Sequence, residues 1–144
     1  MAITQALPNS FKKQLLDGDQ DFSSAGGDVF KLALYVSTAT LGAATTSYTT
    51  SGEVSSSGTN YTTGGKALVN SGTSVVSTVA FTDFADLSFT SVTLTARGCL
   101  IYNTSFSNSA VAVLNFGADK TATSGTFTIQ FPAFTSSAAI IRIS

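Results

Sequence analysis

The sequence contains no histidine and no tryptophan, and only one cysteine and two prolines among its 144 residues. Without histidine, a Ser-His-Asp triad, a Cys-His pair and a histidine metal ligand are all excluded. The single cysteine, Cys99, cannot form an internal disulfide, and no histidine is present to take its proton. We therefore expect a buried, inert thiol. These absences predict a chain that is not an enzyme and that uses no cofactor.

Charged residues are also scarce. They make up 10% of the chain, against about a quarter in an average soluble domain, and the net charge is -1. Such a chain has no basic field that would attract nucleic acid or anionic lipid, so neither is expected as a partner. No apolar run approaches the roughly 18 residues of a membrane span, and the first thirty residues contain no signal-peptide apolar region. We expect a protein that is made and folded in a cytoplasm.

Serine and threonine, about 30% of the residues, supply the polar surface instead. Phenylalanine is abundant as well, with 11 residues. A small β-domain is not expected to bury all of these rings, so some of them predict an exposed patch for a partner.

Residues 1–18 are the one segment with helical features. Asn9 or Ser10 can cap a helix, and Gly18 can end it in the left-handed conformation. We predict one short helix within an N-terminal arm over 1–18, followed by a β-domain over 19–144. The apolar face of the helix is predicted to carry Phe11, Leu15 and Leu16.

After this arm the hydrophobic residues repeat with period two. The segment Val29–Ser37 alternates like a half-buried strand, and Ser91–Asn103 is the strongest strand, with Gly98 marking a bulge or a close backbone approach. Turns are expected at Gly72, over Gly117–Gly125 and over Pro132–Ser137. Further strands are predicted at Lys66–Val69, Ser74–Phe81, Ala110–Phe116, Thr126–Phe131 and Ala138–Ile143, with one or two weak strands around Ser47–Val54.

Seven or eight short strands without intervening helices predict an all-β fold. We expect an antiparallel β-sandwich of jelly-roll or Ig-like type, or a small barrel, with the helix covering an end or an edge.

An acidic run follows the predicted helix. Asp17, Asp19 and Asp21, with Asp28 at the twelfth place, have the spacing of a calcium loop. The sixth place, however, is Phe22 rather than glycine, and the twelfth is aspartate rather than glutamate. The pattern therefore favours a solvated acidic turn and no metal.

Two further motifs are weak. Gly64-Gly65-Lys66 is similar to the end of a phosphate-binding loop, but Asn60 and Ala67 stand where that loop needs a glycine and a hydroxyl, so we predict a turn between edge strands. Arg97 lies on a strand of apolar and hydroxyl residues. It is either exposed or paired with a carboxylate, for which Asp83 and Asp86 are candidates.

Five segments of the sequence carry a resemblance to a known family. They are Ala6–Lys12, Phe30–Tyr35, Gly52–Val54, Tyr61–Gly65 and Ala96–Asn103. Together they resemble a family of small structural proteins of tailed double-stranded DNA bacteriophages, many of them marine or cyanobacterial. The resemblance covers nearly the whole chain and includes no catalytic motif, and it implies a structural role in a virion.

From this resemblance we expect a capsid decoration or cement protein that binds the outer face of the major capsid lattice, as a homo-oligomer and preferably a trimer. The arm, with Leu7, Pro8 and Phe11, is the candidate docking segment, and Arg97 is a further candidate interface residue. A tail, neck or fibre-attachment position is the alternative. A receptor or glycan-binding module is another, with Tyr48 and Tyr61 in its contact surface.

Overall fold

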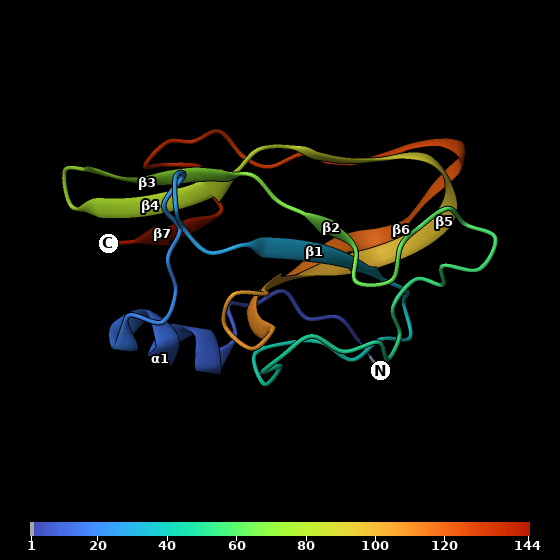
Figure 1. Cartoon of the computed structure of the whole chain (residues 1–144), viewed down its shortest axis with the longest axis horizontal. Coiled ribbons are helices and arrows are strands. Elements are labelled where there is room, and N and C mark those ends of the chain that lie inside the picture. Colours follow the sequence, from blue (N-terminus) through green and yellow to red (C-terminus); the bar gives the residue numbers. More distant parts are fainter. Residues whose placement is uncertain (1) are drawn as a thin grey trace.

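The computed structural model describes residues 2–144. They form one helix, α1 (Asn9–Asp17), and seven strands in two antiparallel sheets (Figure 1). One sheet has the order β2-β1-β5-β6 and the other β3-β4-β7. The predicted all-β class with one short helix is confirmed. The strands are β1 (Phe30–Tyr35), β2 (Lys66–Ala67), β3 (Asn70–Val76), β4 (Val79–Phe84), β5 (Leu87–Asn103), β6 (Ser109–Ile129) and β7 (Ile141–Ile143).

The two long strands β5 and β6 form a single ribbon. They pair from Asn103 and Ser109, beside the connecting turn, to Leu87 and Ile129 at the far end. Strand β1 pairs only with the half of β5 that begins at Gly98. The other half of the ribbon turns back and runs above β1 (Figure 1). One ribbon therefore contributes to both layers of the sandwich.

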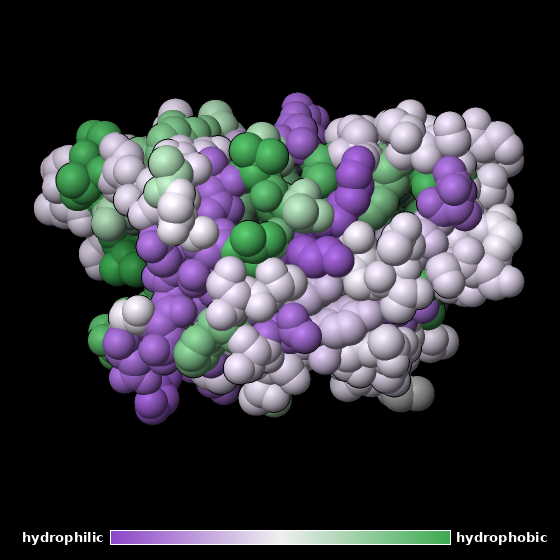
Figure 2. Space-filling model, in the orientation of Figure 1, coloured by the Kyte–Doolittle hydropathy of each residue, from purple (hydrophilic) through white to green (hydrophobic). Residues whose placement is uncertain are grey.

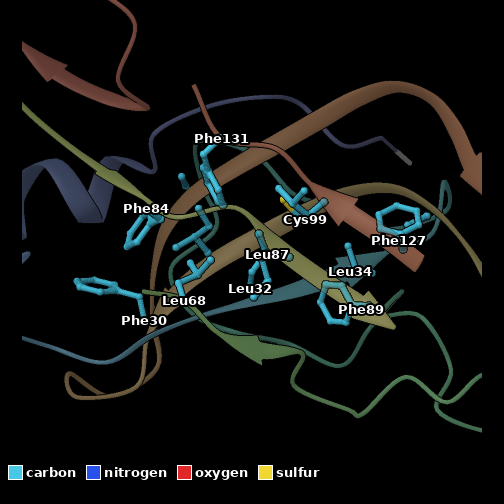
Figure 3. Packing of buried hydrophobic residues seen from close by; sticks show 14 of the residues in the cluster. Phe30, Leu32, Leu34, Leu68, Phe84, Leu87, Phe89, Cys99, Phe127 and Phe131 are labelled. Carbon is cyan, nitrogen blue, oxygen red and sulfur yellow. The ribbon is translucent and has the colours of Figure 1, made fainter. Parts of the chain in front are cut away.

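The main core lies between these layers. Leu32 and Leu34 of β1 face Leu87 and Phe89 of β5, with Phe127 of β6 close by (Figure 3). All five side chains are at most 8% exposed. Burial of large apolar side chains of this kind is the main favourable contribution to folding.

Strand β1 is buried on both faces, which differs from the half-buried strand that its alternation predicts. Leu34 belongs to the main core, whereas Ala33 and Tyr35 belong to a second cluster. That second face is covered by irregular segments, which place Ile3 and Leu41 against it. The alternation identified the strand correctly but carried no information about this third layer.

The two ends of helix α1 lie at Pro8 and Gly18. Pro8 occupies the N-cap without a side-chain cap, so the predicted capping by Asn9 or Ser10 is wrong. Pro8 has φ -56° and ψ 146°, so its backbone is extended and the helical conformation begins after it. Gly18 ends the helix at φ 80°, as predicted.

Phe11 and Leu15 are four residues apart and share the face of the helix that packs on the core. Leu16 points away from that face and is 91% exposed, so the predicted apolar face does not include it.

Three predicted boundaries are wrong in the second sheet and at the chain end. The segment Ser74–Phe81 is not one strand but the hairpin of β3 and β4, which turns at Ser77 with φ 55°. Gly72 lies inside β3 rather than in a turn, and the last predicted strand shortens to β7. The segment Ser47–Val54 makes only isolated bridges, at Ser47 and Glu53.

The predicted loop Gly117–Gly125 is part of β6. Its residues continue the ladder with β5 through the pairs Thr95 with Thr121 and Ala96 with Lys120. Two predicted strands and the loop between them are therefore one strand of 21 residues.

Gly98 marks a close backbone approach, as predicted. A Cβ at this position would lie 2.5 Å from the carbonyl oxygen of Leu114 and 3.0 Å from the side chain of Ile3. The β5–β6 register also shifts between Ala96 and Gly98. Only glycine fits at this point.

Candidate functional site

The tyrosines of the chain gather near its one glutamate, Glu53, beside the end of β1. Residues from three loop positions donate to this carboxylate: the hydroxyl of Tyr48 at 2.6 Å, the hydroxyl of Tyr61 at 2.7 Å and the amide of Gly64 at 2.7 Å. The Tyr61 hydroxyl in turn accepts from the amide of Leu34. Sequence reasoning gave Glu53 no role. One feature of the sequence could have indicated it: Glu53 is the one acidic residue between Tyr48 and Tyr61, in a segment rich in serine and threonine.

The other two tyrosines fix the same loops. Tyr35 donates to the carbonyl of Thr49, and Tyr102 to the carbonyl of Gly64, each at 2.6 Å. The rings of Tyr48 and Tyr102 stack with centroids 4.7 Å apart. We call Glu53 and the four tyrosines the tyrosine clamp, because together they hold residues 48–64 against the sheet.

Burial extends the pH range over which the tyrosines of the clamp stay protonated. It raises the pKa of Tyr102 to about 12, with a smaller contribution from the charge of Glu53. Burial likewise raises the pKa of Tyr35, Tyr48 and Tyr61 above the ordinary tyrosine value. All four hydroxyls are therefore protonated at neutral pH, and they act as hydrogen-bond donors.

The clamp leaves little surface for a glycan. Tyr61 is only 2% exposed, and Tyr48 is half-buried with one face against Tyr102. Tyr61 is therefore not the contact residue that the glycan-binding alternative needs.

The N-terminal arm is also packed into the fold rather than presented outward. Phe11 is fully buried and meets the Phe22 ring edge-on at 6.0 Å. Pro8 is buried and Leu7 half-buried. Ala6 exchanges backbone hydrogen bonds with Val113 of β6. The arm and residues 19–144 share one core, so Pro8 and Phe11 offer no docking surface.

Arg97 is paired with a different carboxylate from those expected. Its Nε donates to Asp119 of β6 at 2.8 Å, and both side chains are partly exposed. Of the expected partners, Asp83 is buried in β4, and Asp86 accepts from the backbone amide of Phe131. An ion pair this exposed contributes about 0.2 to 1 kcal/mol.

The carboxylates of the acidic run accept hydrogen bonds from different donors, although Asp21 and Asp28 are joined through their backbone, with the Asp21 amide donating to the Asp28 carboxylate at 3.0 Å. Asp17 pairs with Lys13, and Asp21 accepts hydrogen bonds from both the amide and the hydroxyl of Ser23. Asp28 accepts from the side chain of Asn103 at 2.7 Å. Within residues 2–144 no three acidic or cysteine side chains are grouped closely enough to hold a metal ion.

The remaining predicted motifs are structural. Gly65 lies against β1, where a Cβ would be 1.8 Å from the carbonyl oxygen of Leu32. The Gly64-Gly65-Lys66 segment is therefore a turn into β2, in agreement with the prediction. Cys99 is fully buried, and this burial raises the pKa of its thiol.

Four large apolar side chains are exposed on the β3–β4 hairpin, β7 and α1, the elements at the left of Figure 1, and Figure 2 shows separate hydrophobic areas on that side. The four side chains are 53% to 91% exposed. A groove of about 280 Å³ opens between the helix and the sheet, and Leu15, Phe81 and Ile143 are among its lining residues. Of the phenylalanines only Phe134 is exposed, so the exposed apolar side chains are mainly aliphatic and the expected patch of phenylalanine rings does not form. We call this surface the apolar end, defined by Leu16, Val75, Val76 and Ile143.

No known protein family, curated protein or solved structure matches this chain. In the part of the chain that the structure describes, no helix is long and apolar enough to cross a bilayer.

Proposed function

We propose that this chain is a non-enzymatic structural protein of a tailed-bacteriophage virion, made in the host cytoplasm. In this proposal it acts as a capsid decoration or cement protein that binds the outer face of the major capsid lattice in many copies. Its partners are the major capsid protein and further copies of itself.

The apolar end is the observation that carries the proposal. Leu16, Val75, Val76 and Ile143 are large apolar side chains that are each exposed, on a chain with few charges. Large apolar side chains exposed on neighbouring elements favour a contact with another protein. Even a small contact per copy suffices in a symmetric shell, because many copies bind together.

The internal polar network supports a passive role. The Glu53 carboxylate accepts three hydrogen bonds from its own chain, and its donors come from turns rather than from an open cleft. These groups hold loops in place. The resemblance to phage structural proteins supplies the virion context.

The number of copies per particle tests this proposal. We expect quantitative mass spectrometry of purified particles to find hundreds of copies, in a fixed ratio to the major capsid protein. Six or twelve copies would assign the chain to the neck or tail instead. Its absence from purified particles would overturn a virion role altogether.

Binding in vitro provides an independent test. Purified chain added to particles assembled without it is expected to saturate at the same ratio. Leu16→Lys at the apolar end should weaken this binding, whereas Val29→Lys, at an exposed valine outside the apolar end, should not. Equal binding by both variants would contradict the assignment of the apolar end.

A further inference from the structure

The outer edge of β3 is open over half of its length. β3 has only one neighbour in its sheet, β4. Its first residues are covered, because the Asn70 side chain donates to the carbonyl of Ser23 and Gly72 lies against Ser24. Residues 73–76 are all exposed. Their outward backbone groups therefore form a short, unpaired strand edge.

Beyond a register irregularity between Asn70 and Thr73, this edge lacks the charged side chains and the proline that usually prevent pairing. The other strands that end a sheet each carry charge: Lys66 on β2, Asp119 and Lys120 on β6, and Arg142 on β7. Strand β3 carries no charge and no proline, and no charged residue occurs between Lys66 and Asp83. Charged side chains and proline are the devices that commonly keep free edges apart. Their absence from β3 alone sets this edge apart from the others.

The hairpin tip has apolar side chains without a core beneath them. Val75 pairs with Ala80, and Val76 with Val79, next to the turn. Val75 and Val76 are 65% and 53% exposed, although successive residues of a strand point to opposite faces. Strand β7 reaches only Ala80–Thr82 of β4. A two-stranded tip with both faces in water has little stability of its own.

We propose that two copies of this chain associate through this edge, with residues 73–76 of each β3 paired antiparallel about a two-fold axis. An antiparallel strand edge is complementary to itself under this symmetry, because each copy supplies the donors that the other accepts. A neutral edge favours a neutral partner, since neither side must desolvate a charge. Val75 and Val76 then cover their counterparts, which accounts for the apolar tip.

This inference deepens the proposed function, because it specifies how copies of the chain contact one another. It also replaces the expected trimer with a two-fold pair at this surface. The paired edge is short, so the contact lies at the small end of specific interfaces, and we expect dissociation constants of about 10 µM.

The experiment measures mass and edge protection on the full chain. Sedimentation equilibrium from about 1 to 200 µM should show a monomer–dimer equilibrium. Val75→Lys should raise the dissociation constant by at least about tenfold. Val69→Lys is the matched control, because Val69 is 67% exposed but lies before β3, and it should leave the equilibrium unchanged. Hydrogen exchange of amides 73–76 should slow as dimer forms, while that of β7 should not.

Several results would overturn the inference. These are a chain that stays monomeric at the highest concentration, a trimer mass, equal weakening by both lysine variants, or protection of β7 instead of β3. Circular dichroism confirms that each variant is folded. A monomeric chain that still saturates particles would remove this inference and leave the proposed function intact.

Discussion

Glu53 shows how a single side chain can organise a long loop. Its Oε2 accepts from Tyr48, and its Oε1 accepts from both Tyr61 and Gly64. Hydrogen bonds to a charged group contribute about 1.5 to 3 kcal/mol, more than neutral ones. The loop over residues 48–64 contains no named strand, so this carboxylate replaces the ladder that would otherwise hold it.

We predict that Glu53→Gln lowers the free energy of unfolding by about 1 to 2 kcal/mol, because the charge is lost and an amide nitrogen faces Tyr48. Tyr48→Phe should then cost less in the Glu53→Gln background than in the native chain. Urea denaturation of the double-mutant cycle measures this difference. Thr121→Val is the control, because the Thr121 hydroxyl pairs with Thr95 on the β5–β6 ribbon and contacts no group of the clamp, so its effect should add independently to that of Glu53→Gln. Full additivity for Tyr48 would contradict the clamp.

Asp83 is a buried carboxylate, and one of its two oxygens accepts no hydrogen bond. It is 1% exposed; its Oδ1 accepts from the amide of Phe84, and its Oδ2 has no partner. Burial raises the pKa of this carboxyl above its ordinary value. Because the folded-state pKa is the higher one, the stability of the folded chain is greatest when Asp83 is protonated and falls as pH rises through that pKa.

We therefore predict that Asp83→Asn stabilises the protein at pH 7 by about 1 kcal/mol, since it removes a buried charge. The gain should shrink in acid and disappear below about pH 4, where the native aspartate is protonated as well. Thermal unfolding at several pH values measures it. Asp119→Asn, at a half-exposed site paired with Arg97, should instead lower stability at pH 7 by about 0.2 to 1 kcal/mol. A destabilised Asp83→Asn at neutral pH would argue that the charge is needed.

At the level of elements, the β5–β6 ribbon has its closest backbone approach at Gly98, beside one of its register shifts. A side chain there would meet a backbone oxygen, which cannot move aside as a flexible side chain can. We predict that Gly98→Ala destabilises the fold by about 1 to 3 kcal/mol. Gly125→Ala in the same ribbon is the control, because its nearest neighbour would be 3.5 Å away, and it should be neutral or slightly stabilising. Chemical denaturation compares the two, and equal effects would show that the approach at Gly98 relaxes freely.

Sequence patterns located most strands but not where they end. The helix stop at Gly18 and the irregularity at Gly98 were predictable, since each follows from the local backbone needs of glycine. The middle of β6 was not, because its exposed Gly, Asp, Thr and Ser residues have the composition of a loop. Cross-strand contacts hold that segment in the sheet, such as the hydroxyl pair of Thr95 and Thr121 and the ion pair of Arg97 and Asp119.

The candidate site was less predictable than the fold. Tyr48 and Tyr61 were singled out from the sequence, but as surface residues, whereas the structure turns both hydroxyls inward to Glu53. The hydrogen bonds that join them span loops without hydrophobic periodicity, so no local pattern reports them. The apolar end also depends on packing, because Val75 and Val76 resemble core residues in the sequence and differ only in having no layer above them.

At the scale of the whole molecule, the arm forms part of the third layer and also joins the main core. Ile3 lies in the second core cluster and Phe11 in the first. We predict that a chain without residues 1–18 does not fold cooperatively, because it exposes both clusters. Near-ultraviolet circular dichroism and thermal unfolding test this. A sharp unfolding transition in the truncated chain would show that residues 19–144 are an independent domain.

The ribbon that contributes to both layers has a consequence for how the chain reaches its fold. Pairing can start at the turn between Asn103 and Ser109 and extend outward one pair at a time, without waiting for distant segments. The slow step is then the closing of the far end over β1. Substitutions beside the turn should slow folding, and those near Leu87 should mainly speed unfolding, as stopped-flow kinetics in denaturant would record.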